Sequence, residues 1–273
     1  MSNTIEIGGI TIHLCEPSTV TQEFVGQNEI VKQLNAAWLV IDDKDAPMNP
    51  RLIGKPGVGK TTLACHVGLQ MKRDLYIQQA TMDTRPEDLI VTPVISEDQK
   101  IKYVASPLVS AMITGSVLIL DEGNRMSEKA WASLAPLLDH RRYVESIVAG
   151  IKINAHKDFR FCTTMNEDSS TYEIPEYIYS RIQPGIHVDY PQKDEERAIL
   201  VENLPSAPSE LIEYVVDFLQ VSHQIGENHS IRDGINVARY AFKLMKTNDI
   251  TSAEGFQKSL ELIVNEGKAK EEF

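Results

Sequence analysis

The chain has 273 residues, of which 42% are hydrophobic and 24% are charged, and its net charge is -12. This composition is typical of a globular protein in water, and no segment approaches the roughly 20 apolar residues that a membrane-spanning helix needs. The acidic charge balance repels polyanions and therefore disfavours DNA or RNA as a partner.

The first residues lack the basic stretch and the apolar run of a secretory signal, so we expect a cytoplasmic protein. The three cysteines lie far apart without a CxxC pair, and the seven histidines show no metal-ligand spacing. We therefore expect reduced thiols and no zinc site.

Short apolar runs alternate with helical patterns over the first 190 residues. This alternation predicts a mainly parallel sheet with helices on both faces. The predicted strands are 51–53, 75–78, 117–120, 159–164 and 186–190.

The strands stop after Tyr190 and Pro191, and helical periodicity follows. Ser230 and Asp233 form a capping-box-like start for one of these helices. We therefore predict an α/β domain at residues 1–190 and a small all-helical domain at residues 191–273. The predicted helices are 195–202, 210–221, 231–245 and 253–264.

The segment GKPGVGKTT, residues 54–62, fits the phosphate-loop pattern G-x-x-x-x-G-K-[ST]. It follows a predicted strand and precedes a helix-compatible stretch at 62–71. Its glycines let backbone N–H groups surround a phosphate, Lys60 would bind the β and γ phosphates, and the Thr61 hydroxyl would bind Mg²⁺. The predicted nucleotide-binding residues here are Gly54, Pro56, Gly57, Val58, Gly59, Lys60, Thr61 and Thr62.

The segment VLILDE, residues 117–122, is a buried-strand pattern that ends in two carboxylates. Its position about 60 residues after a phosphate loop is typical of nucleoside triphosphatases. Asp121 would hold Mg²⁺, and Glu122 would polarise the attacking water.

Together these motifs resemble the AAA+ ATPases, and more closely the MoxR-type branch with the CbbQ, NorQ and gas-vesicle GvpN proteins. The resemblance covers about residues 20 to 245 and includes FVGQNEIV at 24–31, where Val25 and Gly26 would border the adenine. It implies a P-loop core with a helical lid, ATP and Mg²⁺ as cofactors, and a homo-oligomeric, hexameric ring. It also implies a protein client, with a von Willebrand factor A protein as one kind of partner.

Three further residues take their roles from the same resemblance. Asn166 ends FCTTMN, where the family carries sensor 1, and Arg181 in IPEYIYSRI matches the arginine finger, although Ile182 replaces the usual Phe. Arg232 matches sensor 2 because it lies in the first turn of its predicted helix, and Arg239 further along is the alternative.

Two predicted hairpins interrupt the sheet motifs. One comprises strands at 91–95 and 100–104, and the other spans 143–153. The resemblance places both at the pore of the ring, and the alternative is a hairpin without a function.

The leading functional prediction is an ATPase that remodels a partner protein. A nucleic-acid motor or loader is the first alternative, and the acidic charge and the lack of a Lys/Arg-rich stretch count against it. A scaffold that binds ATP without hydrolysing it is the second alternative. The presence of Asp121, Glu122, Asn166 and Arg181 counts against that one.

Overall fold

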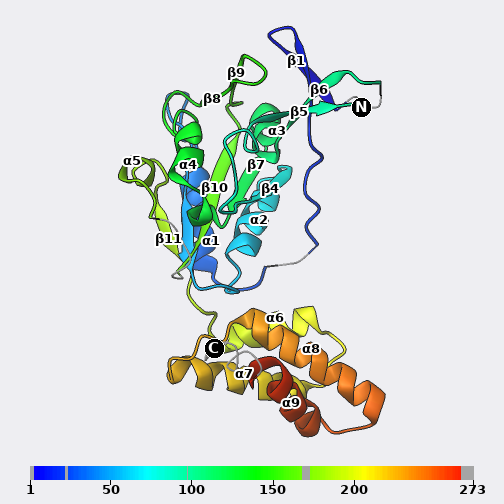
Figure 1. Cartoon of the computed structure of the whole chain (residues 1–273). Helices are drawn as coiled ribbons and strands as arrows, with labels where there is room; N and C mark the ends of the chain where they lie inside the picture. The colour runs from blue at the N-terminus through cyan, green and yellow to red at the C-terminus, as the bar shows by residue number, and fades with distance from the viewer. Residues whose placement is uncertain (1–2, 22–23, 97, 168–172, 266–273) are drawn as a thin grey trace. The chain divides into compact units, whose positions relative to one another are not determined.

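The computed structural model describes residues 3–21, 24–96, 98–167 and 173–265 (Figure 1). The chain groups into two compact units. The α/β unit comprises Met1–Gln22, Glu29–Gly54 and Lys60–His187, and the helical unit comprises Glu23–Asn28, Lys55–Gly59 and Val188–Phe273. Among the described residues, no helix combines the length and the apolar character that crossing a membrane would require.

A five-stranded parallel sheet forms the centre of the α/β unit, with the strand order β11-β3-β10-β7-β4. Its strands are short and almost continuously apolar, as expected for strands buried on both faces. Parallel strands end at the same edge, so the carboxyl ends of β3, β10 and β7 lie next to one another. The strands are β3 (Arg51–Gly54), β4 (Leu75–Gln79), β7 (Val117–Asp121), β10 (Arg160–Asn166) and β11 (Gly185–His187).

Helices cover both faces of this sheet, as the sequence predicts (Figure 1). Leu118 and Leu120 of β7 belong to a core that also includes Met112 and Trp131 from two of the helices. Their neighbours Val117 and Ile119 are fully buried and point to the opposite face, because side chains alternate along a strand. The helices of this unit are α1 (Asn28–Trp38), α2 (Lys60–Gln70), α3 (Pro107–Thr114), α4 (Glu128–Leu134) and α5 (Glu176–Tyr179), with a 3-10 turn η1 (Gly123–Arg125).

A second sheet has the order β1-β2-β6-β5 and contains the first predicted hairpin. β5 (Val91–Ile95) pairs antiparallel with β6 (Ile101–Ala105). β6 begins and ends one residue later than the predicted strand 100–104. An N-terminal hairpin, β1 (Thr4–Ile7) and β2 (Ile10–His13), extends this sheet because β2 pairs parallel with β6. This N-terminal hairpin is not among the predicted elements.

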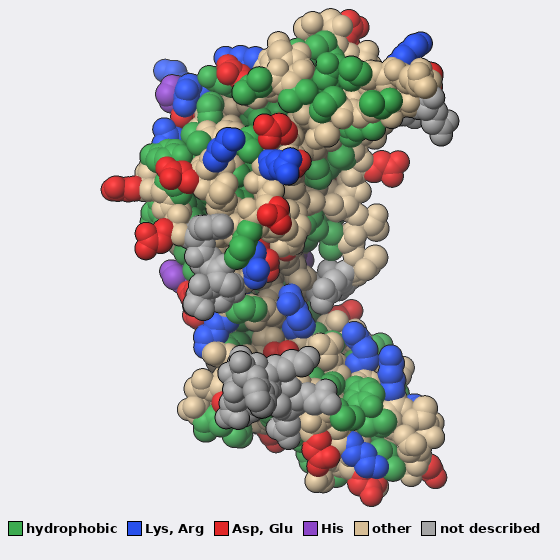
Figure 2. Space-filling view, viewed as in Figure 1, with side chains coloured by type: hydrophobic (Ala, Val, Ile, Leu, Met, Phe, Trp, Pro, Cys, Tyr) green, Lys and Arg blue, Asp and Glu red, His purple; other side chains and the backbone are tan. Residues whose placement is uncertain are grey.

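The second predicted hairpin consists of β8 (Tyr143–Ser146) and β9 (Ile151–Asn154). Apolar side chains stand exposed at the tips of both hairpins: Ile147 is 94% exposed, Ile95 76% and Ile101 64%. Figure 2 shows hydrophobic side chains gathered over the end of the α/β unit that carries β1, β5 and β6. Exposed apolar groups that cluster in this way are typical of a surface that contacts another molecule.

The described chain after residue 190 is helical, as predicted. Leu211, Val215 and Leu219 of α7 are fully buried and pack with Val237 and Ala238 of α8 in a separate core. The helices are α6 (Lys193–Asn203), α7 (Ser209–Gln224), α8 (Ile231–Asn248) and α9 (Ser252–Leu260), with η2 (Glu261–Asn265) at the end.

Several predicted element bounds differ from those in the structure. The last strand covers Gly185–His187 rather than 186–190, because its partner strand β3 ends at Gly54, one residue past the partner of His187. The last α-helix ends at Leu260 rather than 264, and a π-helical turn, Glu261–Asn265, continues it. The strand predicted at 159–164 begins at Arg160 and extends to Asn166.

Glu196 on α6 is a fully buried carboxyl group in the helical unit. Gln220 Nε2 donates to its Oε2 at 2.9 Å, and His223 Nδ1 lies 3.7 Å from its Oε1, which accepts no hydrogen bond in the described structure. Burial raises the pKa of Glu196 from 4.5 to about 7, and the bond from Gln220 opposes that change. The charged form is therefore disfavoured in the folded unit.

This raised pKa predicts a pH-dependent stability. The contribution of neutral Glu196 to folded stability is fully present below pH 4.5, where the group is neutral in both the folded and the unfolded state. It is lost as the pH rises through about 7. The loss is roughly 3 kcal/mol, since one pKa unit corresponds to about 1.4 kcal/mol. Urea unfolding followed by circular dichroism between pH 5 and pH 8 measures it. Glu196→Gln should flatten this pH dependence. The control is Glu202→Gln, an exposed position on the same helix, which should leave it unchanged. If wild type and Glu196→Gln show the same pH dependence, Glu196 is not its source.

Candidate functional site

The phosphate loop lies between the end of β3 at Gly54 and the start of α2 at Lys60, the strand–loop–helix context that the motif requires. Gly57 and Gly59 have φ of +80° and +97°. Side chains other than glycine rarely adopt this left-handed backbone, so the two glycines permit a loop whose amides turn inward. A Cβ on Gly57 would also lie 2.3 Å from Ser230 Oγ in the helical unit, which leaves no room for a larger residue.

Lys60 is buried, with 6% of its surface exposed. Its Nζ donates to the carbonyl oxygen of Gly54 at 2.7 Å, and this bond holds the ammonium group against the phosphate loop. A buried ammonium needs anionic or carbonyl partners, because burial away from water disfavours the charge. The position of Lys60 thus fits recognition of a phosphate group.

Asp121 lies at the end of β7 and accepts two hydroxyl hydrogen bonds on Oδ1. Thr61 Oγ1 donates at 2.7 Å from the start of α2, and Thr164 Oγ1 donates at 2.6 Å from β10. The structure thus brings together the two residues that the sequence predicts as Mg²⁺ ligands. Hydroxyl and carboxylate oxygens are the donors that Mg²⁺ prefers, so these residues fit the cation.

Glu122 follows directly and has φ of 55° and ψ of 42°. Non-glycine residues in this left-handed region are uncommon and cluster at functional sites. Its backbone N–H donates to Thr164 Oγ1 at 2.9 Å, which fixes the turn. Its side chain accepts from Asn166 Nδ2 at 3.0 Å on Oε1 and forms an ion pair with Arg125 Nε at 2.7 Å on Oε2.

Asn166 is buried at the end of β10, opposite Gly54 in the register with β3. The side chain of Asn124 fixes its backbone from both sides: Asn124 Nδ2 donates to the Asn166 carbonyl at 2.8 Å, and Asn124 Oδ1 accepts from the Asn166 N–H at 3.4 Å. The amide of Asn166 is therefore held toward Glu122, where it can orient a carboxylate.

Arg181 follows α5 and is 29% exposed at its side chain. Its Nε lies 3.4 Å from Asp139 Oδ2, and its Nη1 donates to the carbonyl of Tyr177. The structure therefore does not bring Arg181 into the Glu122–Asn166 contacts of its own chain, which is compatible with an arginine that acts on a second copy.

The predicted base-binding segment belongs to the helical unit. Val25 and Gly26 are half-buried, and the N–H of Gln27 donates to Glu195 Oε1. Glu195 Oε2 accepts from the N–H of Gln192 at 2.9 Å, so one carboxylate caps α6 and anchors this segment. Gly26 has φ of +83°, and a Cβ there would lie 2.6 Å from Glu195 Oε1, so this position also requires glycine.

Arg232 lies in the first turn of α8, and its side chain is exposed. Its Cβ is 3.2 Å from the point where a Cβ on Gly57 would lie, within the same unit. Arg239 is also exposed but lies two turns further along the helix, about 10 Å away at 1.5 Å per residue. Ser230 and Asp233 form the predicted capping box.

Several residues of the site are absent from the sequence prediction. Thr164 contacts both acidic residues, Arg125 pairs with Glu122, and Glu195 binds Gln27. Thr164 lies two residues before Asn166 on a strand, and residues at that spacing share a face, so the period of the strand could have identified it. Arg125 follows Glu122 by three residues, a local spacing that could have suggested the ion pair. Gln27 and Glu195 lie 168 positions apart, and no local pattern joins them.

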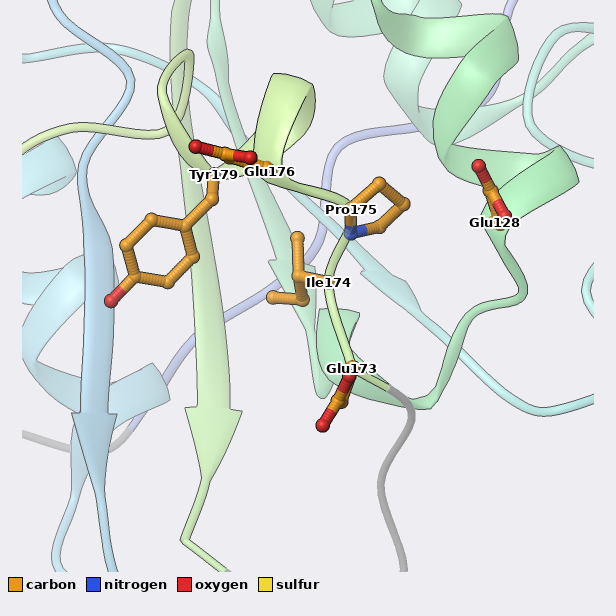
Figure 3. Close-up of a pocket in the computed structure, with 6 residues that line it drawn as sticks. All are labelled: Glu128, Glu173, Ile174, Pro175, Glu176 and Tyr179. Atoms are coloured by element: carbon orange, nitrogen blue, oxygen red, sulfur yellow. The ribbon is translucent and has the colours of Figure 1, made fainter.

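A pocket of about 530 Å³ lies beside α5, lined by six residues that include no predicted site residue (Figure 3). Three of the six are carboxylates and none is basic, so the pocket does not suit a triphosphate. The lining residues are Glu128, Glu173, Ile174, Pro175, Glu176 and Tyr179.

Residues 51–182 match the sequence family described as an AAA domain of the dynein-related subfamily. An uncharacterized protein of Staphylococcus epidermidis is 28% identical over 175 residues, which are 62% of this chain and 66% of that protein. An uncharacterized protein of Staphylococcus aureus is 27% identical over 179 residues, covering 64% of this chain and 68% of that protein.

Two solved structures share the fold at low identity. The Holliday junction branch migration motor RuvB of Thermotoga maritima has a TM-score of 0.58 and 15% identity over 88% of this chain and 70% of RuvB. NtrX of Brucella abortus, solved in complex with ADP, has a TM-score of 0.58 and 14% identity over 83% of this chain and 53% of NtrX. The chain therefore has the P-loop AAA+ fold, and its residues 51–182 match the AAA domain of the dynein-related subfamily.

Proposed function

We propose that this chain binds ATP with Mg²⁺, hydrolyses it to ADP and phosphate, and remodels a partner protein in the cytoplasm as a MoxR-type AAA+ ATPase. One observation carries this proposal. At the carboxyl ends of neighbouring parallel strands, Asp121 accepts from Thr61 at 2.7 Å, and Glu122 accepts from Asn166 at 3.0 Å. The two residues proposed to bind Mg²⁺ and the two proposed to activate water thus lie beside Gly54 and Lys60, the ends of the phosphate loop.

Binding of the triphosphate depends on the phosphate loop. Gly57 and Gly59 let the loop amides point at phosphate oxygens, and Lys60 adds an ammonium group. Thr61 and Asp121 would hold Mg²⁺, which supplies charge neutralisation to the phosphates when bound. Gly54, Pro56, Val58 and Thr62 complete the proposed loop contacts.

Glu122 and Asn166 account for the chemistry. The Glu122 carboxylate would accept a hydrogen bond from the attacking water and take up its proton, and Asn166 orients that carboxylate through the 3.0 Å bond. An amide also donates to phosphate oxygens without adding negative charge, so Asn166 suits a position between water and phosphate. Both side chains are thus pre-oriented before the reaction begins.

The helical unit supplies two further contacts in this proposal. Val25 and Gly26 would border the adenine, on a segment that Glu195 anchors to α6. Arg232 would contact the γ phosphate, since its Cβ lies beside Gly57 of the phosphate loop and its exposed side chain forms no hydrogen bond or ion pair with any described residue. The position of Arg232 in the first turn favours it over Arg239 for this role.

We further propose a homo-oligomeric, hexameric ring in which Arg181 of one subunit completes the site of the next. A permanently charged, planar guanidinium suits the charge that develops on a transferred phosphoryl group. The exposed apolar tips of the two hairpins, with Ile95, Ile101 and Ile147, would face the pore and contact the client protein. A von Willebrand factor A protein remains one proposed partner.

Mixing two inactive variants tests the shared site. Arg181→Ala should bind ATP nearly normally and hydrolyse it about 10³-fold more slowly, because an arginine finger acts mainly on the transition state. Glu122→Gln subunits retain Arg181, so adding them to Arg181→Ala subunits should restore turnover where an intact finger meets an intact Glu122. Steady-state phosphate release across the mixing series, with light scattering for particle mass, measures this.

The double variant Glu122→Gln/Arg181→Ala is the matched control, since it offers no intact finger and should restore nothing. Activity per chain should rise with protein concentration until rings form. A monomer with full activity, indifferent to concentration and to Arg181→Ala, would rule out the ring while leaving nucleotide binding untouched.

A further inference from the structure

The side chain of Arg181 is held in one orientation by its own chain. Nε faces Asp139 Oδ2 at 3.4 Å, and Nη1 donates to the carbonyl of Tyr177. The backbone is fixed as well, because Asn49 Nδ2 donates to the Arg181 carbonyl at 3.2 Å and to the Leu138 carbonyl at 3.0 Å. Nη2 has no partner among the described residues, so one edge of the guanidinium stays available.

The position of Asp139 does not depend on Arg181. Arg141 binds the Asp139 carboxylate through two atoms, with Nε at 3.0 Å from Oδ1 and Nη2 at 2.8 Å from Oδ2. The N–H of Arg141 also donates to Oδ1 at 3.0 Å. These contacts hold the pKa of Asp139 well below its usual range, so the carboxylate stays ionised near neutral pH.

Buried apolar residues anchor both segments to the same core. Leu138 precedes Asp139 and is 4% exposed, while Ile178 and Ile182 on either side of Arg181 are fully buried. Packing in the core therefore fixes the two backbone segments that carry Asp139 and Arg181. Without the contacts to Asp139 and Tyr177, the arginine side chain would have to lose the rotational freedom of several torsions before it could act.

We propose that Asp139 is a positioning residue for Arg181: it fixes the guanidinium so that the free edge at Nη2 is presented to the nucleotide bound by a second copy of the chain. This inference rests on the proposed function of Arg181. The Asp139 side chain is 14% exposed and also binds Arg141, so loss of its charge should cost some stability, which thermal unfolding measures separately from kcat. Asparagine keeps an oxygen that can accept from the Arg141 N–H, so we expect the variant to fold and its main effect to be on the reaction.

The substitution Asp139→Asn tests this role because it keeps the shape and removes the charge. We expect kcat to fall by about 10- to 100-fold, the scale of a catalytic group displaced by about 1 Å, with the KM for ATP within about twofold of wild type. Asp139→Glu, which restores the charge, should recover part of the loss. In an Arg181→Ala background Asp139→Asn should have no further effect, since the two changes remove one interaction.

Asp158→Asn is the matched control. It removes a comparable aspartate–arginine pair in the same unit, Asp158 with Arg73 at 3.3 Å, and should leave kcat unchanged. Thermal unfolding of all variants shows whether they are folded. If Asp139→Asn and Asp139→Glu lose kcat equally, or lose it only together with the melting transition, the role of Asp139 is structural and the proposal is wrong.

Subunit mixing separates this inference from the proposed function. Asp139→Asn subunits mixed with Glu122→Gln subunits should regain turnover, because the second variant carries an intact Asp139–Arg181 pair. If Asp139→Asn is impaired and mixing does not restore turnover, Asp139 acts in the active site of its own subunit, and the proposal is wrong. A wild-type kcat for Asp139→Asn beside an impaired Arg181→Ala would also overturn it, with the ring function intact. If Arg181→Ala itself has wild-type activity, the proposed ring function fails and the role of Asp139 falls with it.

Discussion

Replacement of Lys60 by alanine is expected to abolish measurable ATP binding. Lys60 contributes a buried positive charge at the start of α2, held by the Gly54 carbonyl at 2.7 Å, and the backbone amides of the loop are neutral. Hydrogen bonds between charged groups contribute about 1.5–3 kcal/mol each, and two phosphates lose a partner here. The affinity should therefore fall by at least about 100-fold, as measured by isothermal titration with ATP.

Lys129→Ala provides the control for this experiment, because Lys129 is an exposed lysine on α4 of the same unit. That variant should bind ATP as the wild type does. Unchanged ATP affinity in Lys60→Ala would show that the phosphate-loop assignment is wrong, and the proposed function would fail with it.

The substitution Glu122→Gln should separate binding from hydrolysis. Glutamine keeps the size of the side chain and an oxygen that can accept from Asn166, but it cannot take up a proton from water. ATP should bind with nearly wild-type affinity and persist. Phosphate release should fall by about 10²- to 10⁴-fold, the usual contribution of general acid–base catalysis. Titration and a steady-state phosphate assay on the same preparation measure the two effects.

Glu128→Gln, an exposed carboxylate on α4 that contacts neither Asp121 nor Asn166, is the matched control and should hydrolyse ATP normally. Turnover at the wild-type rate in Glu122→Gln would assign the general base to another residue. Loss of ATP binding in that variant would instead indicate that Glu122 contributes to the nucleotide pocket itself.

Much of the fold is predictable from the sequence, because two strong local signals coincide. The strand at 117–120 is continuously apolar and ends in Asp121, and the loop at 54–62 has glycines where the backbone needs positive φ. Parallel pairing of β3, β10 and β7 then brings together residues that lie far apart in the sequence. For this reason Thr61, Asp121, Glu122 and Asn166 lie as close together as the motifs indicate.

The N-terminal hairpin, β1 and β2, was not predicted from the sequence. The Gly8-Gly9 pair lies between two alternating runs with Ile5, Ile7 and Ile10, which is a hairpin signal. Its pairing partner is β6, about 90 residues later, and no local pattern specifies that partner. The N-terminal hairpin joins the fold through distant contacts: pairing with β6 and packing of Ile12 in the core.

The contacts of Arg181 with Asp139 and of Glu195 with Gln27 were also not predictable from the sequence. Each joins residues 42 to 168 positions apart, and the chemistry of a single carboxylate does not indicate its partner. Local patterns identify a residue type suited to a role, whereas the three-dimensional structure identifies the neighbour that orients it.

Phosphate release by the wild-type chain tests most directly whether this site hydrolyses ATP. The purified 273-residue chain is incubated with saturating ATP and Mg²⁺ over a range of protein concentrations, and released phosphate is followed against Glu122→Gln in parallel. We predict Mg²⁺-dependent turnover per chain that rises with concentration and exceeds that of Glu122→Gln by at least about 100-fold. Tight ATP binding with no more phosphate release than Glu122→Gln, at every concentration, would contradict hydrolysis and support an ATP-binding scaffold.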